Sequence, residues 1–152
     1  MAEVNVTRTR LSKIAGTKAP ASSFNRVREA VASMAAAYVA PANGDTAGTD
    51  LVLVQGSRLV GGVFVSNAAG NASSTLSVGL RDPITKVAID ATAIVNALAI
   101  SAAGAQTVNT GTKLISGQDY ILPQDCEVYL TFGGAAGLAN QQIRVEVPFI
   151  AA

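Results

Sequence analysis

The feature that most constrains this chain is a two-residue period of apolar and polar side chains, which dominates from about residue 50 onward. The period is clearest in Gln142–Ile150 and returns in Thr75–Arg81 and Glu127–Phe132. Successive side chains of a β-strand point to opposite faces, so this alternation is typical of antiparallel strands with one buried face. We therefore expect these three runs to be strands that share one core.

Parity assigns the side chains of these runs to the two faces of a sheet. The inward set is Val128, Leu130, Phe132, Val145, Val147 and Phe149, and the outward set includes Glu127, Tyr129 and Thr131. Cys126 has inward parity, and a free cysteine is among the most buried residue types. We therefore expect a buried, unreactive thiol.

Shorter runs separated by turn residues extend the same pattern. The weaker strand candidates are Leu51–Val54, Leu59–Ser66, Lys86–Asp90, Lys113–Ser116 and Tyr120–Leu122. The segments between them are rich in Gly, Asn, Asp, Ser and Pro, which favour turns. Short strands with frequent turns predict an all-β antiparallel sandwich or barrel. Pro148 cannot donate to a ladder, so the last strand is expected to lie at an edge there.

Two stretches are ambiguous between helix and strand. Val27, Val31, Met34 and Tyr38 recur at helical spacing, but β-branched residues and the turn that follows favour a strand. Asp90–Ala99 begins with a possible helix N-cap, which favours one or two helical turns there.

The composition indicates one domain that associates with other chains. The chain has 152 residues, of which 49% are hydrophobic and 14% are charged, against about 25% charged residues in typical soluble domains. A surface with so little charge is expected to be covered in part by neighbouring subunits. We therefore expect a homo-oligomer, with a trimer as the favoured form.

The residues needed for common catalytic and metal chemistry are missing. The chain has no histidine and one cysteine, which excludes Ser-His-Asp triads, Cys-His pairs and ordinary zinc sites. The glycine-rich segment Gly133–Gly137 is interpreted as a hairpin loop, and Asn43–Asp50 as turn residues rather than a Ca²⁺ loop. We expect no enzyme activity, no catalytic residues, no cofactor and no metal.

Basic residues are concentrated at the N-terminus. Residues 1–28 carry six basic groups and one acidic group, a net charge of +5, while residues 29–152 carry five and nine, a net charge of −4. We predict a basic arm over residues 1–28 and a β-sandwich domain over residues 29–152. Val4, Val6, Arg8 and Arg10 alternate as in a strand that pairs with a neighbour's sheet edge. The predicted partner-binding residues of the arm are Val4, Val6, Arg8, Arg10, Lys13, Lys18, Arg26 and Arg28.

A protein is the favoured partner of this arm. Nucleic acid is a weaker alternative, because the basic residues of the arm are sparse and the rest of the chain has a net negative charge. A second alternative is that the arm is a tail without a partner. No run reaches the ~18 apolar residues that span a bilayer, and Ala30–Ala42 lies too far from the start to resemble a signal peptide. We expect no membrane partner and synthesis in a cytoplasm.

Two segments resemble small virion proteins of tailed bacteriophages. They are Gly44–Leu59, and Asn71–Asp82 with its turn of Ser and Thr before an alternating strand. The closing segment from Glu127, a Gly/Ala loop and a final strand fits the same pattern. The resemblance covers about residues 40 to 150 and leaves out the arm.

This resemblance implies a jelly-roll-like sandwich and a capsid decoration (cement) protein. Such a protein would bridge neighbouring subunits of the major capsid protein on the virion exterior, after synthesis in the bacterial host cytoplasm. The alternatives are another virion component of the same fold, in the tail, neck or head fibre, and a β-sandwich module that binds a ligand such as carbohydrate.

Overall fold

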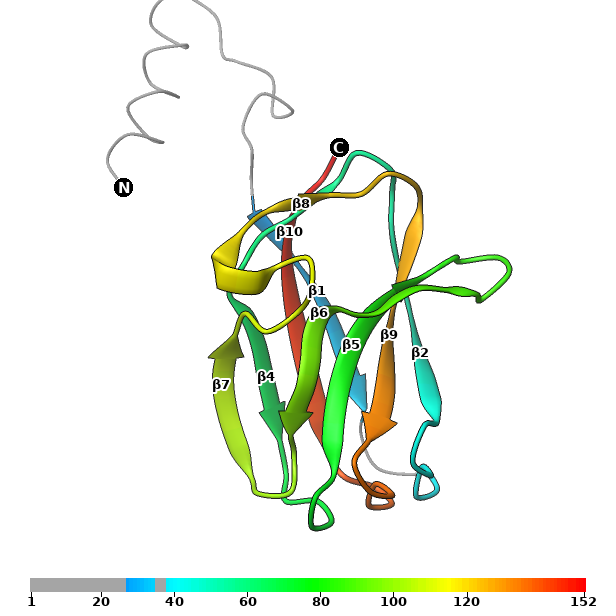
Figure 1. The fold of residues 1–152 in the computed structure, drawn as a ribbon, viewed down its shortest axis with the longest axis vertical. Coiled ribbons are helices and arrows are strands. Elements are labelled where there is room, and N and C mark those ends of the chain that lie inside the picture. The colour runs from blue at the N-terminus through cyan, green and yellow to red at the C-terminus, as the bar shows by residue number, and fades with distance from the viewer. Residues whose placement is uncertain (1–26, 35–37) are drawn as a thin grey trace, which may run out of the picture.

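The structure, a computed structural model, describes residues 27–34 and 38–152, and these form two packed antiparallel sheets (Figure 1). The strands are β1 (Val27–Met34), β2 (Thr46–Leu53), β3 (Arg58–Leu59), β4 (Val63–Asn67), β5 (Thr75–Arg81), β6 (Ala88–Ala99), β7 (Gly104–Val108), β8 (Tyr120–Ile121), β9 (Cys126–Gly133) and β10 (Ile143–Ile150). A short 3₁₀ helix spans Ile115–Gly117. The all-β antiparallel sandwich expected from the sequence is confirmed.

The strand order is that of a jelly roll. The six-stranded sheet contains β1, β10, β4 and β7 in that order, with β3 and β8 beside the end of β10, and the four-stranded sheet runs β2-β9-β5-β6. The first strand, β1, therefore pairs with the last, β10, and the next long strand, β2, pairs with β9. The pairs are thus nested along the sequence. This double-sheet arrangement of eight main strands is the jelly-roll architecture.

The core lies between the two sheets and follows the predicted parity. Cys126, Val128, Leu130 and Phe132 of β9 are buried, and so are Val145 and Val147 of β10. Phe149 is partly buried against the same cluster. The Cys126 thiol is enclosed, and burial raises its pKa, which agrees with the expectation of a buried thiol.

The predictions for the two ambiguous stretches had different outcomes. Residues 27–34 form β1, as favoured. The helical turns predicted for Asp90–Ala99 are wrong, because this segment belongs to the strand β6. A β-bulge interrupts the period of two in this strand: Leu76 pairs with Leu98 but Val78 pairs with Val95, so β6 holds one more residue there than β5. Ala97 takes up the irregularity with φ of 46°.

The strand predicted at Lys113–Ser116 is also wrong. Thr112 and Lys113 donate their amides to Thr92 and Ala93 of β6 at 2.9 and 3.0 Å, and the chain then turns into the 3₁₀ helix. Gly111 makes this approach possible, because a Cβ there would lie 2.3 Å from the Ile94 backbone.

Other strand limits differ from the sequence prediction. The predicted strand Leu59–Ser66 is split into β3 and β4, and β2 begins at Thr46 rather than at Leu51. The strand β7 was not predicted, because Gly104–Val108 has four exposed residues and no apolar alternation. Edge strands that bury little give a weak period-two signal.

The edge predicted at Pro148 is wrong, because β10 is flanked on both sides. Pro148 lies opposite Glu29 of β1, and its carbonyl accepts the Val60 amide at 3.1 Å on the other side. The N–H and C=O of a strand residue point to the same side, so the missing N–H faces the irregular segment between β3 and β4. No ladder bond to β1 is lost.

Candidate interaction surfaces

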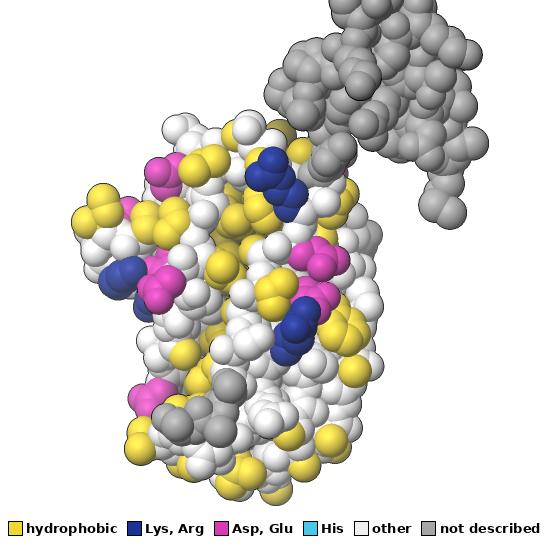
Figure 2. Space-filling view, turned by 180° about the vertical axis from the view of Figure 1, so that it is seen from behind, with side chains coloured by type: hydrophobic (Ala, Val, Ile, Leu, Met, Phe, Trp, Pro, Cys, Tyr) yellow, Lys and Arg dark blue, Asp and Glu magenta, His cyan; other side chains and the backbone are white. Residues whose placement is uncertain are grey.

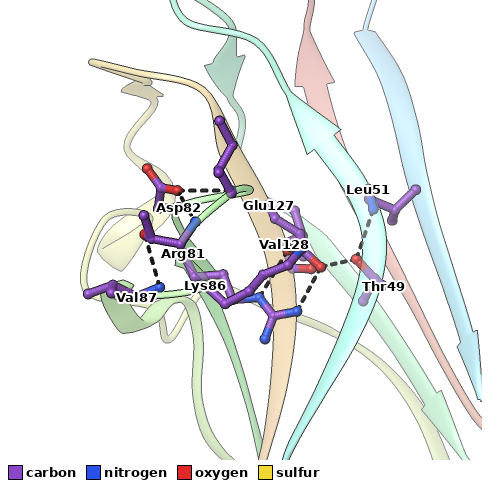
Figure 3. Close-up of polar contacts among 10 residues, drawn as sticks. Thr49, Leu51, Arg81, Asp82, Lys86, Val87, Glu127 and Val128 are labelled. Atoms are coloured by element: carbon purple, nitrogen blue, oxygen red, sulfur yellow. Dashed lines mark hydrogen bonds and ion pairs between the residues drawn. The ribbon is translucent and has the colours of Figure 1, made fainter.

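A buried carboxylate lies on the outer face of the four-stranded sheet. Glu127 of β9 is 1% exposed, and both its oxygens accept hydrogen bonds from Arg81 of β5, from Nε at 3.0 Å and from Nη2 at 2.8 Å. Lys86 Nζ donates to Oε2 at 2.6 Å. Figure 3 shows Arg81 and Lys86 converging on Glu127. We call Glu127, Arg81 and Lys86 the carboxylate cluster.

The neighbours of the carboxylate cluster enclose it. The Arg81 guanidinium stacks 5.2 Å from the centre of the Tyr129 ring, a distance suited to a cation–π contact. A Cβ at position 48 would lie 2.5 Å from Arg81 Nη2 and 3.0 Å from Glu127 Oε1, so β2 passes close over the pair at Gly48. Hydrogen bonds from Arg81, aided by Lys86, lower the pKa of Glu127 to about 2, although burial alone would raise it.

Glu127 and Tyr129 point away from the core as predicted, but they are not on the surface. Both are almost fully buried, at 1% and 3% exposure, because Arg81, Lys86 and the backbone of β2 cover them. The sequence contains no signal for this, since Arg81 and Glu127 become neighbours only through the register of β5 and β9.

The hairpin between β5 and β6 projects from the sandwich and carries exposed apolar residues (Figure 1). Ile84 is 88% exposed and Val87 is 65% exposed. Asp82 Oδ1 accepts the amides of Ile84 and Thr85 at 2.9 and 2.7 Å, which orders the turn and lowers the pKa of Asp82. Lys86, with φ of 59°, ties the hairpin to Glu127. The sequence predicts turn and strand residues here but contains no signal for an exposed apolar surface.

The side of the sandwich between β1 and β2 is open. Met34 of β1 and Ala47 and Leu51 of β2 belong to the core but are only partly buried. Seen from behind, a strip of apolar side chains runs down the molecule (Figure 2). We call the side formed by Met34, Ala47 and Leu51 the open side.

Arg28 is the one predicted arm residue that the structure describes. It is an exposed residue of β1 and lies opposite Phe149 of β10. The other seven predicted partner-binding residues, Val4, Val6, Arg8, Arg10, Lys13, Lys18 and Arg26, lie outside the described residues.

The described residues contain neither a metal-binding cluster nor a membrane-spanning helix. No group of three or more His, Cys, Asp or Glu in residues 27–34 and 38–152 is placed to hold a metal ion. No helix in the same ranges is long and apolar enough to cross a membrane. In the segment Asn43–Asp50, residues 46 to 50 belong to β2, and Asp45 Oδ2 accepts the Ala42 amide at 2.7 Å.

Among known proteins, one solved structure has a similar fold. No protein-family model and no curated protein matches the chain. Among solved structures, it is similar to a chain of the cyanophage Pam1 capsid asymmetric unit, with a TM-score of 0.58 and 20% identity. The match covers 84% of this chain and 86% of that chain, so the two are of similar length. At this identity the likeness shows the fold: both chains are built on the same sandwich.

Proposed function

We propose that this chain is a structural protein of a bacteriophage particle that decorates and stabilises the capsid by bridging neighbouring capsid subunits. The observation that carries the proposal is the likeness to a chain of a phage capsid asymmetric unit over most of both chains. The partner would be the major capsid protein together with other copies of this chain, and the protein would act without catalysis.

The surface chemistry supports a role in protein contacts. The chain combines a low charge content with large apolar side chains at the surface, among them Ile84 and Val87 on the ordered hairpin. Exposed apolar residues on a preorganised element lose little conformational entropy on binding, which suits an interface. The basic residues of the arm would add electrostatic attraction to an acidic partner surface.

The copy number per particle tests this proposal. Particles of the phage that encodes the chain should be purified, and the ratio of this chain to the major capsid protein should be measured by quantitative mass spectrometry. A decoration protein is expected at hundreds of copies per particle, and electron microscopy should place it on the outer shell. A few copies at the tail or neck would contradict the decoration role, and absence from the particle would contradict a virion role altogether.

A further inference from the structure

The edge strands of the two sheets are not equally protected against pairing with another chain. In β2 a bulge lies between Gly48 and Leu51, with Asp50 at φ of 57°, and the Thr49 hydroxyl bonds to the Val128 carbonyl (Figure 3). In β6 the edge is covered by residues 110 to 113. The strands β7 and β8 are short, with five and two residues. Bulges, covering loops and short strands are established ways to block edge pairing.

The edge of β1 has none of these protections among the described residues. All eight residues of β1 pair with β10 in unbroken register, and no described strand pairs with its other side. The carbonyl of Pro148 points away from β1, so Glu29 and Pro148 form a non-hydrogen-bonded pair. The backbone groups of Glu29, and by alternation those of Val27, Val31 and Ser33, therefore face the free edge.

The core residues beside this edge are small or only partly buried. The inward residues at the centre of β1 are Ala30 and Ala32, which are small, and the core residues next to them on the open side are only partly buried. A strand added to β1 would satisfy its free backbone groups and lay alternate side chains over the open side. The occupant should thus be a short alternating segment with small or β-branched apolar residues.

We propose that β1 receives residues 4–10 of a second copy of this chain as an added strand. The segment Val-Asn-Val-Thr-Arg-Thr-Arg has seven residues against eight in β1. In a strand, Val4 and Val6 would share one face with Arg8 and Arg10, and Asn5, Thr7 and Thr9 would share the other. Residues 1–26 carry a net charge of +4, while residues 27–152 carry −3. The acceptor strand itself carries an exposed acidic residue, Glu29.

The length of the connection allows the arm to reach a second copy. Sixteen residues separate Arg10 from Val27, whereas a hairpin back onto the chain's own β1 needs only about two to five. Fully extended, sixteen residues span up to about 55 Å, enough to reach a neighbouring subunit. The inference concerns contacts between free copies and does not depend on the proposed virion function.

Cysteine cross-linking distinguishes the two arrangements. In a Cys126→Ala background, Asn5→Cys, Thr7→Cys or Thr9→Cys in one chain should be mixed with Val31→Cys in another and oxidised. These arm positions share the face opposite Val4 and Val6, as Val31 faces away from the core. At least one arm position is expected to give a covalent dimer, whereas the exposed control Val87→Cys should not. Cross-linking only within chains that carry both cysteines, or none at any arm position, would overturn the proposal.

Blocking the edge provides a second test in the full chain. Val31→Pro removes an N–H that faces the free edge and leaves the hydrogen bonds to β10 in place. Sedimentation should show self-association weakened by about tenfold or more in this variant, with Val31→Thr close to wild type. Equal association of a folded Val31→Pro variant and wild type would contradict the proposal. If Val31→Pro does not fold, the cross-linking result decides.

Discussion

The outer face of the four-stranded sheet and the open side between β1 and β2 differ in whether their polar groups find hydrogen-bond partners within the chain. On the outer face, a carboxylate is buried and its needs are met within the chain by Arg81 and Lys86. On the open side, core residues stay partly exposed and the backbone groups of one edge have no described partner. The first region therefore stabilises the single subunit, and the second suits contact with another chain.

The largest expected effect in this comparison is the loss of the buried carboxylate. Glu127→Gln leaves Arg81 and Lys86 without a countercharge, so the free energy of unfolding should fall by about 3 kcal/mol, the low end for a broken buried pair, because Lys86 is half exposed. Urea unfolding of wild type and variant measures this loss of stability. The matched control is Glu146→Gln, which breaks the more exposed pair with Arg144 at 2.6 Å and should cost less than about 1 kcal/mol. Similar losses in both variants would remove the distinction between the carboxylate cluster and an ordinary surface pair.

The carboxylate cluster also predicts how stability depends on pH. The pKa of Glu127 is about 2 in the folded protein against 4.5 as its ordinary value, so the unfolded chain takes up a proton at higher pH. The contribution of Glu127 is then complete above about pH 4.5 and is lost as the pH falls through about 2, a loss of at most ~3 kcal/mol.

Urea unfolding at several pH values between 5 and 2 tests this sign. The stability of wild type should fall over that window, and Glu127→Gln should show a shallower fall because only the other carboxylates, such as Asp82 and Asp90, still titrate. Parallel curves for the two proteins would show that Glu127 does not carry the dependence.

A smaller effect is expected where β2 crosses the carboxylate cluster. Gly48→Ala places a methyl group 2.5 Å from Arg81 Nη2, and the clamped guanidinium has little freedom to move. Stability should fall by about 1–3 kcal/mol. Gly104→Ala is the control, because a Cβ there meets nothing within 4 Å. Thermal unfolding of the two variants compares them, and a Gly48→Ala protein as stable as Gly104→Ala would show that the cluster can shift aside.

The sequence predicted most of the fold but little of these two regions. The strands β5, β9 and β10 were predicted within a residue, because each buries most of one face and this burial produces a clear period of two in the sequence. The bulge in β6 interrupts that period, and the possible N-cap at Asp90 suggested a helix instead. The pairing of Arg81 with Glu127 and the open side both depend on which strands become neighbours, and a single sequence does not encode strand order in any local pattern.

The central claim is that this chain works through strand-edge contacts with its neighbours. Amide hydrogen exchange in β1 tests this claim most directly. The amides of Ala30 and Ala32 pair with β10, while those of Glu29 and Val31 face the free edge. In the full-length protein at associating concentrations, both sets should be protected from exchange. After deletion of residues 1–26, Glu29 and Val31 should exchange rapidly while Ala30 and Ala32 stay protected. Rapid exchange of Glu29 and Val31 in the full-length protein, or protection unchanged by the deletion, would contradict the account.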